Sequence, residues 1–244
     1  MTQLDLWLQP VSGAPVQWAE HNAGVLDDDE AQRWKRYHRQ ESQDLFLVAH
    51  VATRFVLSHY GTATPGEWAY ERGENGRPEI ADGPAGLRFN ISHTEGMVAV
   101  LVHGEADCGV DIEHPGRELD LHTVSRRVFT KYEQAAVFAQ SPEQRADWFF
   151  GLWTLKEAFI KANGKGFALP LKQFGFTMQD VPGVDDNRIG FACDASIDSA
   201  PDRWGFFVRR TESGHIVSVA ARHDQEPGEA SVVIRQLNTE AGCS

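Results

Sequence analysis

The segment from Ser141 to Gly166 constrains the fold of this chain most, because it combines a helix start, an apolar stripe and a helix stop. Ser141 can cap a helix, the proline that follows it suits the first helical position, and Gln144 can reach back to the cap. Asn163 followed by glycine favours a left-handed stop. An apolar stripe at steps of three and four residues is formed by Leu152, Leu155, Phe159 and Ala162. The segment therefore predicts a helix that ends near Asn163.

The same helix carries charged side chains at helical spacing. Glu157 and Lys161 are four residues apart and share a face, and Lys156 directly precedes the glutamate. An isolated pair of this kind is usually a surface ion pair that contributes about 0.3–0.5 kcal/mol. Here Trp153 and Ile160 make the surroundings of the pair partly apolar. A carboxylate and a lysine on such a half-buried face suit a metal and phosphate site.

Composition limits the classes of protein to which the chain can belong. With 244 residues, of which 41% are hydrophobic, it can form one large domain or two halves of about 120 residues. A net charge of −12 argues against general binding of nucleic acid or anionic lipid. The 3 cysteines lie far apart, which predicts neither a disulfide framework nor a zinc site. Without an apolar run of about 18 residues, we expect a cytoplasmic protein that binds no membrane.

The first part of the chain predicts a strand followed by helices. Alternating leucines from Leu4 to Leu8 predict an opening strand. Acidic residues from Asp27 to Glu30 begin a helical segment that breaks or bends around 40–42 and stops at Gly61. The densest basic cluster of the chain lies in this segment and consists of Arg33, Lys35, Arg36 and Arg39. Such a cluster is ordinarily a solvated helix face.

A hairpin is predicted next, with candidate phosphate-binding residues near it. Residues 87–91 form its first strand, 94–96 the break, and the run MVAVLV its second strand. His93 beside the break is either an ordinary loop histidine or a cationic donor to a phosphate. Arg77 precedes a proline, which favours an extended backbone and leaves the guanidinium able to reach a ligand.

The run CGVDIE from Cys108 to Glu113 predicts a third strand with two carboxylates on one face. Asp111 and Glu113 point to the side opposite Val110 and Ile112. On an edge strand this pattern is usually a solvated face, but beside a helix carboxylate it can bind magnesium. Two short helices follow in 120–139, and the segments after Gly166 read as short antiparallel strands.

Three motifs together resemble the 4′-phosphopantetheinyl transferases, and in particular the double-length type that activates surfactin synthetase. They are FNISH (89–93), GVDIE (109–113) and WTLKEAFIKANGKG (153–166). A strand with DxE followed by a helix with WxxKExxxK is far more specific for this family than either motif alone. The resemblance runs in order from Arg33 to Gly166, and the last third of the chain carries no motif of its own.

The resemblance implies an α+β fold of two pseudo-duplicated halves, each with an antiparallel sheet and a long helix, and an active site in the cleft between them. We expect residues 1–105 to form the half that grips coenzyme A, 106–225 the half with the metal carboxylates and catalytic helix, and 226–244 a tail. A chain of this length would supply both halves itself, so a monomer is expected.

The resemblance also implies the reaction and its partners. The 4′-phosphopantetheine arm of coenzyme A would pass to a serine of an apo acyl or peptidyl carrier protein, with release of 3′,5′-ADP. The carrier would serve fatty-acid, polyketide or nonribosomal-peptide synthesis. The reaction would need Mg²⁺, for which Mn²⁺ can substitute.

Residue roles follow from the same resemblance. Asp111, Glu113 and Glu157 would hold the metal, Glu157 could also accept the serine proton, and Lys161 would stabilise the developing charge. The expected coenzyme A contacts are Ser92, His93, Arg77, Lys156 and, for the 3′-phosphate, the basic residues 33–39, above all Arg33 and Arg36. Two positions depart from the family pattern, Asp44 and Glu95, which place acids where coenzyme A phosphates are expected.

Two other functions are compatible with single motifs. A non-catalytic module could bind coenzyme A or a carrier protein, but it would not need a complete set of acids. A hydrolase could use Asp111 and Glu157 as an acid and base pair on a glycoside or phosphoester. Metal dependence with coenzyme A as donor distinguishes the transferase from the hydrolase, and the complete set of acids distinguishes it from the module.

Overall fold

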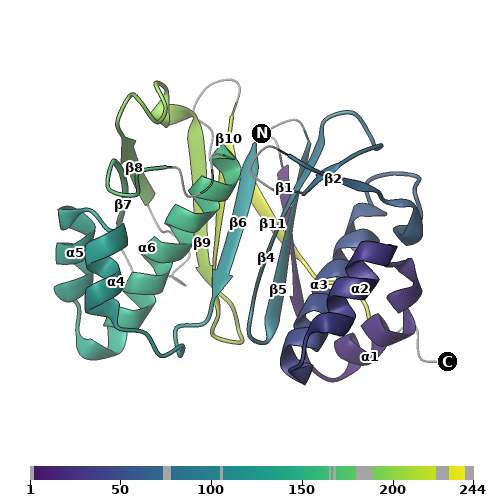
Figure 1. Ribbon diagram of the computed structural model, residues 1–244. Coiled ribbons are helices and arrows are strands. Elements are labelled where there is room, and N and C mark those ends of the chain that lie inside the picture. Colours follow the sequence, from purple (N-terminus) through teal and green to yellow (C-terminus); the bar gives the residue numbers. More distant parts are fainter. Residues whose placement is uncertain are drawn as a thin grey trace. The chain divides into compact units, whose positions relative to one another are not determined.

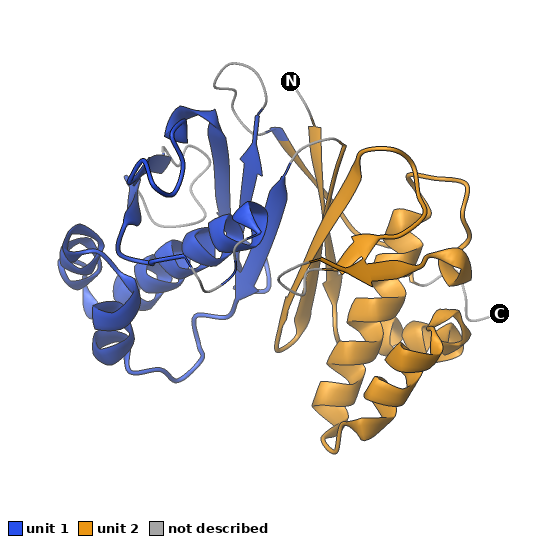
Figure 2. Cartoon of the chain, turned by 45° about the horizontal axis from the view of Figure 1, so that its top comes forward, with its two compact units in different colours: residues 1–2, 106–231 blue, residues 3–105, 232–244 orange. Residues whose placement is uncertain are grey.

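The computed structural model of the chain describes residues 3–73, 78–104, 107–164, 166, 169–179, 189–223 and 231–239 (Figure 1). The chain divides into two compact units (Figure 2). We call Gln3–Glu105 with Val232–Ser244 the N-terminal unit, and Ala106–Ser231 with Met1–Thr2 the C-terminal unit. Each unit combines helices with antiparallel strand pairs, which confirms the α+β class. None of the described helices is both long and apolar enough to cross a membrane.

The N-terminal unit consists of a four-stranded sheet in the order β11-β1-β5-β4, a small β2-β3 ribbon, and helices that pack on the sheet. Leu8 of β1 pairs with Ala99 of β5, and Ile91 of β4 pairs with Val100, so the predicted hairpin and opening strand are both present. In chain order the elements are β1 (Gln3–Pro10), α1 (Ala14–His21), η1 (Ala23–Val25), α2 (Asp28–Arg36), α3 (Gln40–Leu57), η2 (Pro65–Glu67), β2 (Tyr70–Arg72), β3 (Pro78–Ile80), β4 (Leu87–Thr94), β5 (Met97–Gly104) and β11 (Ser231–Arg235).

Strand β11 changes the expected domain limits. The sequence predicts a separate tail from residue 226, but β11 joins the sheet of the N-terminal unit beside β1. Arg235 Nε donates to Asp5 Oδ1 at 3.0 Å, and the guanidinium lies 5.9 Å from the ring of Trp7. The described residues 232–239 are therefore part of the N-terminal unit.

The helical segment breaks earlier than predicted. The helix begins at the predicted acidic residues, where Asp27 and Glu30 form a capping box, and α2 then ends at Arg36. Tyr37 adopts an extended conformation with ψ 134, and its carbonyl accepts a hydrogen bond from Gln43 Nε2 at 2.6 Å. Because this side chain replaces a helical partner for the carbonyl, the break lies before Gln40 instead of within 40–42.

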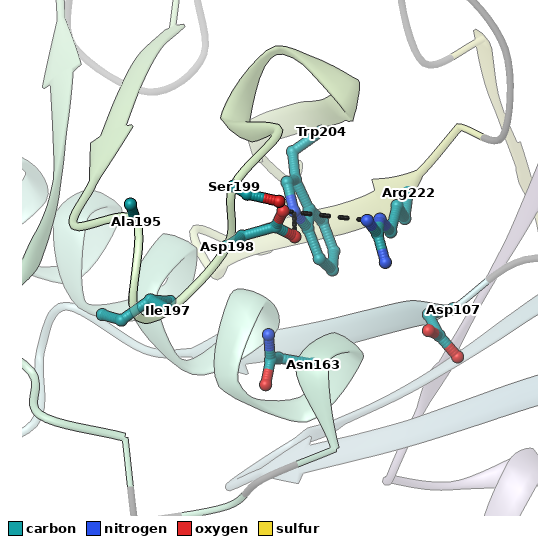
Figure 3. Close-up of a pocket in the computed structure, with 8 residues that line it drawn as sticks. All are labelled: Asp107, Asn163, Ala195, Ile197, Asp198, Ser199, Trp204 and Arg222. Carbon is teal, nitrogen blue, oxygen red and sulfur yellow. Dashed lines mark hydrogen bonds and ion pairs between the residues drawn. The ribbon is translucent and has the colours of Figure 1, made fainter.

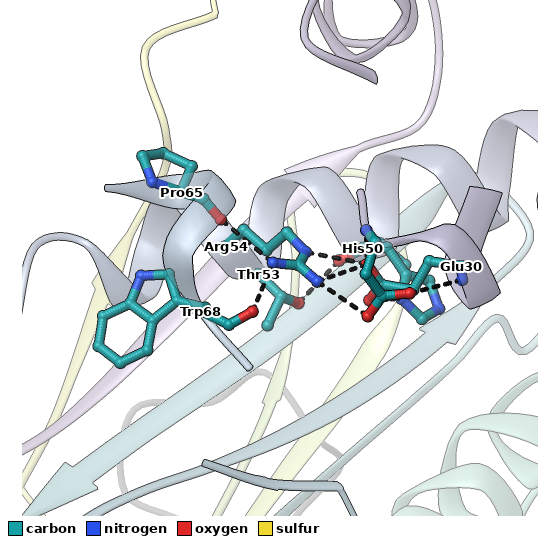
Figure 4. Close-up of polar contacts among 8 residues, drawn as sticks. Glu30, His50, Thr53, Arg54, Pro65 and Trp68 are labelled. Carbon is teal, nitrogen blue, oxygen red and sulfur yellow. Dashed lines mark hydrogen bonds and ion pairs between the residues drawn. The ribbon is translucent and has the colours of Figure 1, made fainter. Parts of the chain in front are cut away.

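A buried arginine joins the two halves of this helix pair, and nothing in the local sequence indicated it (Figure 4). Arg54 on α3 is 1% exposed, and its Nε donates to Glu30 Oε2 at 2.9 Å. One Nη donates to the carbonyl of Trp68 at 2.7 Å and the other to Asp27 Oδ2 at 3.2 Å. Glu30 also contacts His50 Nδ1 at 2.8 Å. One guanidinium therefore connects the start of α2, the last turn of α3 and the loop before β2.

Replacing Glu30 by glutamine should reduce the free energy of unfolding by about 2 kcal/mol at pH 7, because charge-assisted hydrogen bonds to Arg54 are lost. Burial alone would raise the pKa of Glu30, but the hydrogen bonds and charges of His50 and Arg54 lower it below its ordinary value of 4.5. A lowered pKa stabilises the fold above pH 4.5, and this contribution disappears as the pH falls through the folded-state pKa.

The check is denaturant unfolding of the wild type and of Glu30→Gln between pH 7 and pH 3. The difference in free energy should narrow below pH 4.5. The exposed Glu41 in the first turn of α3 supplies the control, Glu41→Gln, which should stay close to the wild type throughout. A difference between Glu30→Gln and the wild type that does not depend on pH would contradict this assignment.

The C-terminal unit has a three-stranded sheet in the order β6-β10-β9 and the long helix α6 packed against it. A second, two-stranded sheet, β7-β8, contributes aromatic side chains to the same core. The elements are β6 (Cys108–Glu113), α4 (Leu121–Val128), α5 (Lys131–Phe138), α6 (Pro142–Asn163), β7 (Phe174–Met178), β8 (Ile189–Cys193), η4 (Pro201–Arg203), β9 (Trp204–Arg210) and β10 (Ile216–Arg222).

Helix α6 has the predicted ends but is buried on more than one side. Gly164 stops it in the left-handed conformation with φ 74, as the Asn-Gly pair predicts. Phe159 contacts the rings of Phe174, Phe191 and Trp204, at centroid distances of 4.9, 4.8 and 4.8 Å. The predicted stripe of Leu152, Leu155, Phe159 and Ala162 is buried, and the β7-β8 sheet adds aromatic side chains to the same core.

Candidate active site

The absence of a side chain at Gly109 allows strand β6 to approach helix α6 closely. A Cβ at Gly109 would lie 2.2 Å from the carbonyl oxygen of Ala158 and 2.5 Å from the amide nitrogen of Ala162. Real Cβ atoms essentially never come this close to a non-bonded atom, so only glycine fits at this position. Asp111 follows two residues later and therefore shares the strand face that lies against the helix. The GVDIE motif thus contains both the close approach and the carboxylate that it positions.

The close approach brings Asp111 and Lys161 together, as the resemblance implies. Lys161 Nζ donates to Asp111 Oδ1 at 2.7 Å and to the carbonyl oxygen of Val110 at 3.0 Å. The side chain of Asp111 is 9% exposed and that of Lys161 is 28% exposed. The pair therefore lies at the edge of the buried layer, where an outside ligand can reach the ammonium.

Glu157 belongs to the same cluster. Burial, together with the charges of Asp111 and Glu113, raises the pKa of its carboxyl to about 7, although the charge of Lys161 lowers it. Glu157 lies one turn before Lys161 on α6 and is partly exposed. Three carboxylates from two elements are thus close enough to affect one another.

Glu113 has a partner that the sequence reasoning missed. Arg117 Nη1 donates to Glu113 Oε1 at 3.0 Å, and the arginine side chain is 56% exposed. Asp111 thus contacts the cationic side chain of Lys161, and Glu113 contacts that of Arg117. Spacing offers a weak signal for the second pair, since Arg117 follows Glu113 by four residues.

The donor chemistry of this cluster fits magnesium. Carboxylate oxygens are the hard ligands that Mg²⁺ prefers, and a cation would offset the burial and the charges of Asp111 and Glu113 that raise the pKa of Glu157. Within the part of the chain that the structure describes, no three His, Cys, Asp or Glu side chains form a preassembled metal site. The fit of Asp111, Glu113 and Glu157 to the metal therefore rests on their chemistry and charge.

A buried pair of hydroxyl groups connects β10 to α6 next to the carboxylate cluster. Ser218 on β10 lies directly opposite Asp111 in the strand register. Its Oγ is 2.7 Å from Thr154 Oγ1 on α6, and both residues are fully buried. Thr154 precedes Glu157 by three residues, so this contact ties the sheet to the same part of the helix.

The structure overturns the role expected for Lys156. Its side chain was predicted to contact coenzyme A, but the residue is 2% exposed and points into the core of the C-terminal unit. The ammonium donates to the carbonyl oxygens of Leu171 and Phe174, both at 2.7 Å, and pairs with Glu133 Oε2 at 3.2 Å. Since its three protons have these three acceptors, Lys156 does not belong to the ligand-binding surface.

The remaining predicted residues lie in the N-terminal unit. Ser92 and His93 are neighbours on β4, the first buried and the second exposed. Arg33 lies in the last turn of α2 with its guanidinium 5.4 Å from the ring centroid of Phe46, and Arg36 is exposed in the same turn. Arg77 lies outside the described residues. Whether these side chains meet the carboxylate cluster around one ligand stays a prediction.

A cavity of about 370 Å³ lies elsewhere in the C-terminal unit (Figure 3). Its Asp198 accepts a hydrogen bond from Trp204 Nε1 at 2.9 Å and faces Arg222 at 3.7 Å. None of the candidate metal or catalytic residues lines this cavity. The lining residues are Asp107, Asn163, Ala195, Ile197, Asp198, Ser199, Trp204 and Arg222.

Comparison with known proteins identifies the family. Residues 107–202 match the model of the 4′-phosphopantetheinyl transferase superfamily. The 4′-phosphopantetheinyl transferase Sfp of Bacillus subtilis is 26% identical, over 88% of this chain and 90% of the relative. A second 4′-phosphopantetheinyl transferase of Bacillus subtilis is 30% identical, over 64% of this chain and 68% of the relative. The chain belongs to the 4′-phosphopantetheinyl transferase family.

As a phosphopantetheinyl transferase, the chain is an enzyme, and the matched region contains the whole carboxylate and lysine cluster. Among solved structures, one similar to this chain is a Chronobacterium ammoniagenes ACPS-CoA complex. The match covers 49% of this chain and 98% of the chain in that complex. The TM-score of that match is 0.38 and the sequence identity is 16%.

Proposed function

We propose that this phosphopantetheinyl transferase moves the 4′-phosphopantetheine arm of coenzyme A to a serine of an apo carrier protein, with magnesium and with release of 3′,5′-ADP. The observation that carries the proposal is the cluster of Asp111, Glu157 and Lys161 on β6 and α6, with Lys161 Nζ 2.7 Å from Asp111 Oδ1. Phosphoryl transfer needs neutralised charge and aligned groups more than covalent participation by the protein. A cluster of carboxylates with one accessible ammonium suits that requirement.

In the proposed reaction the serine oxygen forms a bond to the β-phosphorus of coenzyme A. The bond between that phosphorus and the oxygen of 3′,5′-ADP breaks, and the serine proton must pass to a base. Glu157 is the candidate base, because its partly exposed carboxylate belongs to the cluster with Asp111 and Lys161. Asp111, Glu113 and Glu157 would hold the magnesium, which supplies charge neutralisation at the pyrophosphate when bound.

Cationic side chains would complete the site. Lys161 would stabilise the negative charge that develops on the phosphoryl group and on the leaving nucleotide. His93, with Ser92 and Arg77, would contact phosphates of coenzyme A, and Arg33 with Arg36 would contact the 3′-phosphate. We propose that the enzyme acts as a monomer on acyl or peptidyl carrier proteins.

Replacing Lys161 by alanine should lower kcat more than it raises KM for coenzyme A, because the ammonium would act on charge that exists mainly in the transition state. Initial rates at varied coenzyme A concentration, with saturating magnesium and carrier, provide the measurement. A matched control is Lys131→Ala, which removes a lysine from α5 at a position outside the cluster and should leave both constants unchanged. An effect of Lys161→Ala on KM alone would indicate ordinary ligand binding.

The proposal is tested by following the nucleotide product. With coenzyme A and magnesium, 3′,5′-ADP should appear only when an apo carrier is present, and in a one-to-one ratio with the holo carrier formed. Release of nucleotide without any carrier would instead indicate a hydrolase. Removal of magnesium by a chelator should stop both products.

A further inference from the structure

The buried ammonium of Lys156 has four neighbours at fixed positions in the C-terminal unit. Two backbone carbonyl oxygens, of Leu171 and Phe174, accept from its ammonium at 2.7 Å. The carboxylate of Glu133 lies 3.2 Å away, and the ring centroid of Phe174 lies 4.3 Å away. These partners come from three parts of the C-terminal unit, so the lysine connects α6 to all of them.

Glu133 is itself fixed on several sides. It is 0% exposed, and Oε2 accepts from the amide of Thr130 at 2.7 Å in the capping box of α5. Its other oxygen accepts from the amide of Phe176 on β7 at 2.9 Å. The carboxylate therefore cannot shift to follow Lys156 without breaking bonds to α5 and β7.

Such a buried pair is a weak source of stability. Taking both charges out of water costs several kcal/mol per ion, and well-packed apolar residues often replace buried pairs without loss of stability. The pair does restrict the orientation of α6. Most other contacts of this helix are apolar, and apolar contacts allow more sliding and rotation than hydrogen bonds, which require a defined distance and angle. Its clearest effect is therefore on where α6 sits and how the helix is rotated.

We propose that Lys156 is a positioning residue, which with Glu133 fixes the rotation and position of α6 and thereby holds the adjacent Glu157 beside Asp111. The proposal rests on the proposed function, in which Glu157 and Asp111 are metal ligands. On the sheet side of the helix, the contact of Thr154 with Ser218 at 2.7 Å gives a second fixed point. Two directional contacts, two residues apart along α6, define the orientation of the turn that carries Glu157.

The test uses three variants, Lys156→Met, Glu133→Gln and the double variant. Magnesium binding is measured by calorimetric titration without coenzyme A, and kcat and KM are measured separately. Each variant should bind magnesium about tenfold more weakly and show kcat about tenfold lower, with KM for coenzyme A unchanged. Should a single variant fail to fold, the double variant carries the test, because it leaves no unpaired charge in the core.

Phe159→Leu is the control for loss of stability alone. It creates a cavity on the same helix and should lower the free energy of unfolding while leaving magnesium affinity and kcat unchanged. Unchanged magnesium affinity in the folded Lys156 and Glu133 variants would overturn the positioning role, and a raised KM for coenzyme A alone would restore direct ligand contact by Lys156. A wild-type chain that binds magnesium but transfers nothing would contradict the proposed function, and the titration would still decide the positioning role.

Discussion

Replacing Glu157 by glutamine is expected to lower the rate of phosphopantetheine transfer by at least about 100-fold while the chain folds normally. Glutamine has nearly the same shape, but it cannot accept a proton and is a poorer ligand for magnesium. Removing the carboxylate should not harm the fold, because burial and the charges of Asp111 and Glu113 already make its ionised form unfavourable.

The measurement is the initial rate of holo-carrier formation at saturating magnesium and coenzyme A, with thermal unfolding as the test of folding. Glu143 lies exposed in the first turn of the same helix, so Glu143→Gln is the matched control and should have wild-type activity. Near wild-type turnover of Glu157→Gln at saturating magnesium would remove Glu157 from the site.

Gly109→Ala should reduce the free energy of unfolding by about 3 kcal/mol or more, and it should abolish most activity at the same time. The added methyl group would stand 2.2 Å from the carbonyl oxygen of Ala158, which is a backbone atom of a buried helix and cannot rotate away. Either β6 must move away from α6 or the helix must deform. Both movements separate Asp111 from Lys161.

The control for this substitution is Gly104→Ala at the end of β5, where a Cβ meets nothing within 4 Å. Its free energy of unfolding should stay within about 0.5 kcal/mol of the wild type. Denaturant unfolding of both variants provides the comparison. If the Gly109→Ala protein were as stable and active as Gly104→Ala, the close approach of β6 and α6 would be needed neither for the fold nor for the site.

Local patterns predicted the elements that depend on local chemistry. Asp27 with Glu30, and Thr130 with Glu133, form the capping boxes that their spacing indicates, and the Asn-Gly pair after Ala162 ends α6. Alternation around Asp111 placed the strand, and the four-residue step from Glu157 to Lys161 placed both on one helix. These features need no knowledge of which elements pack together.

Features that depend on tertiary packing could not be predicted in the same way. Lys156 and Glu157 are neighbours in the sequence, yet one points into the core and the other belongs to the carboxylate cluster, because successive residues of a helix are about 100° apart. Whether Lys156 points to ligand or core depends on Glu133, which lies on another helix. Likewise, the pairing of β11 beside β1 and the burial of Arg54 depend on contacts between residues far apart in the chain.

The central claim is tested most directly by the intact mass of a purified apo carrier protein after incubation with this enzyme, coenzyme A and magnesium, beside a sample containing a chelator. The account predicts that the carrier gains the mass of one phosphopantetheine group only in the sample with magnesium. An unchanged mass across both acyl and peptidyl carriers, by an enzyme that still binds coenzyme A, would contradict it.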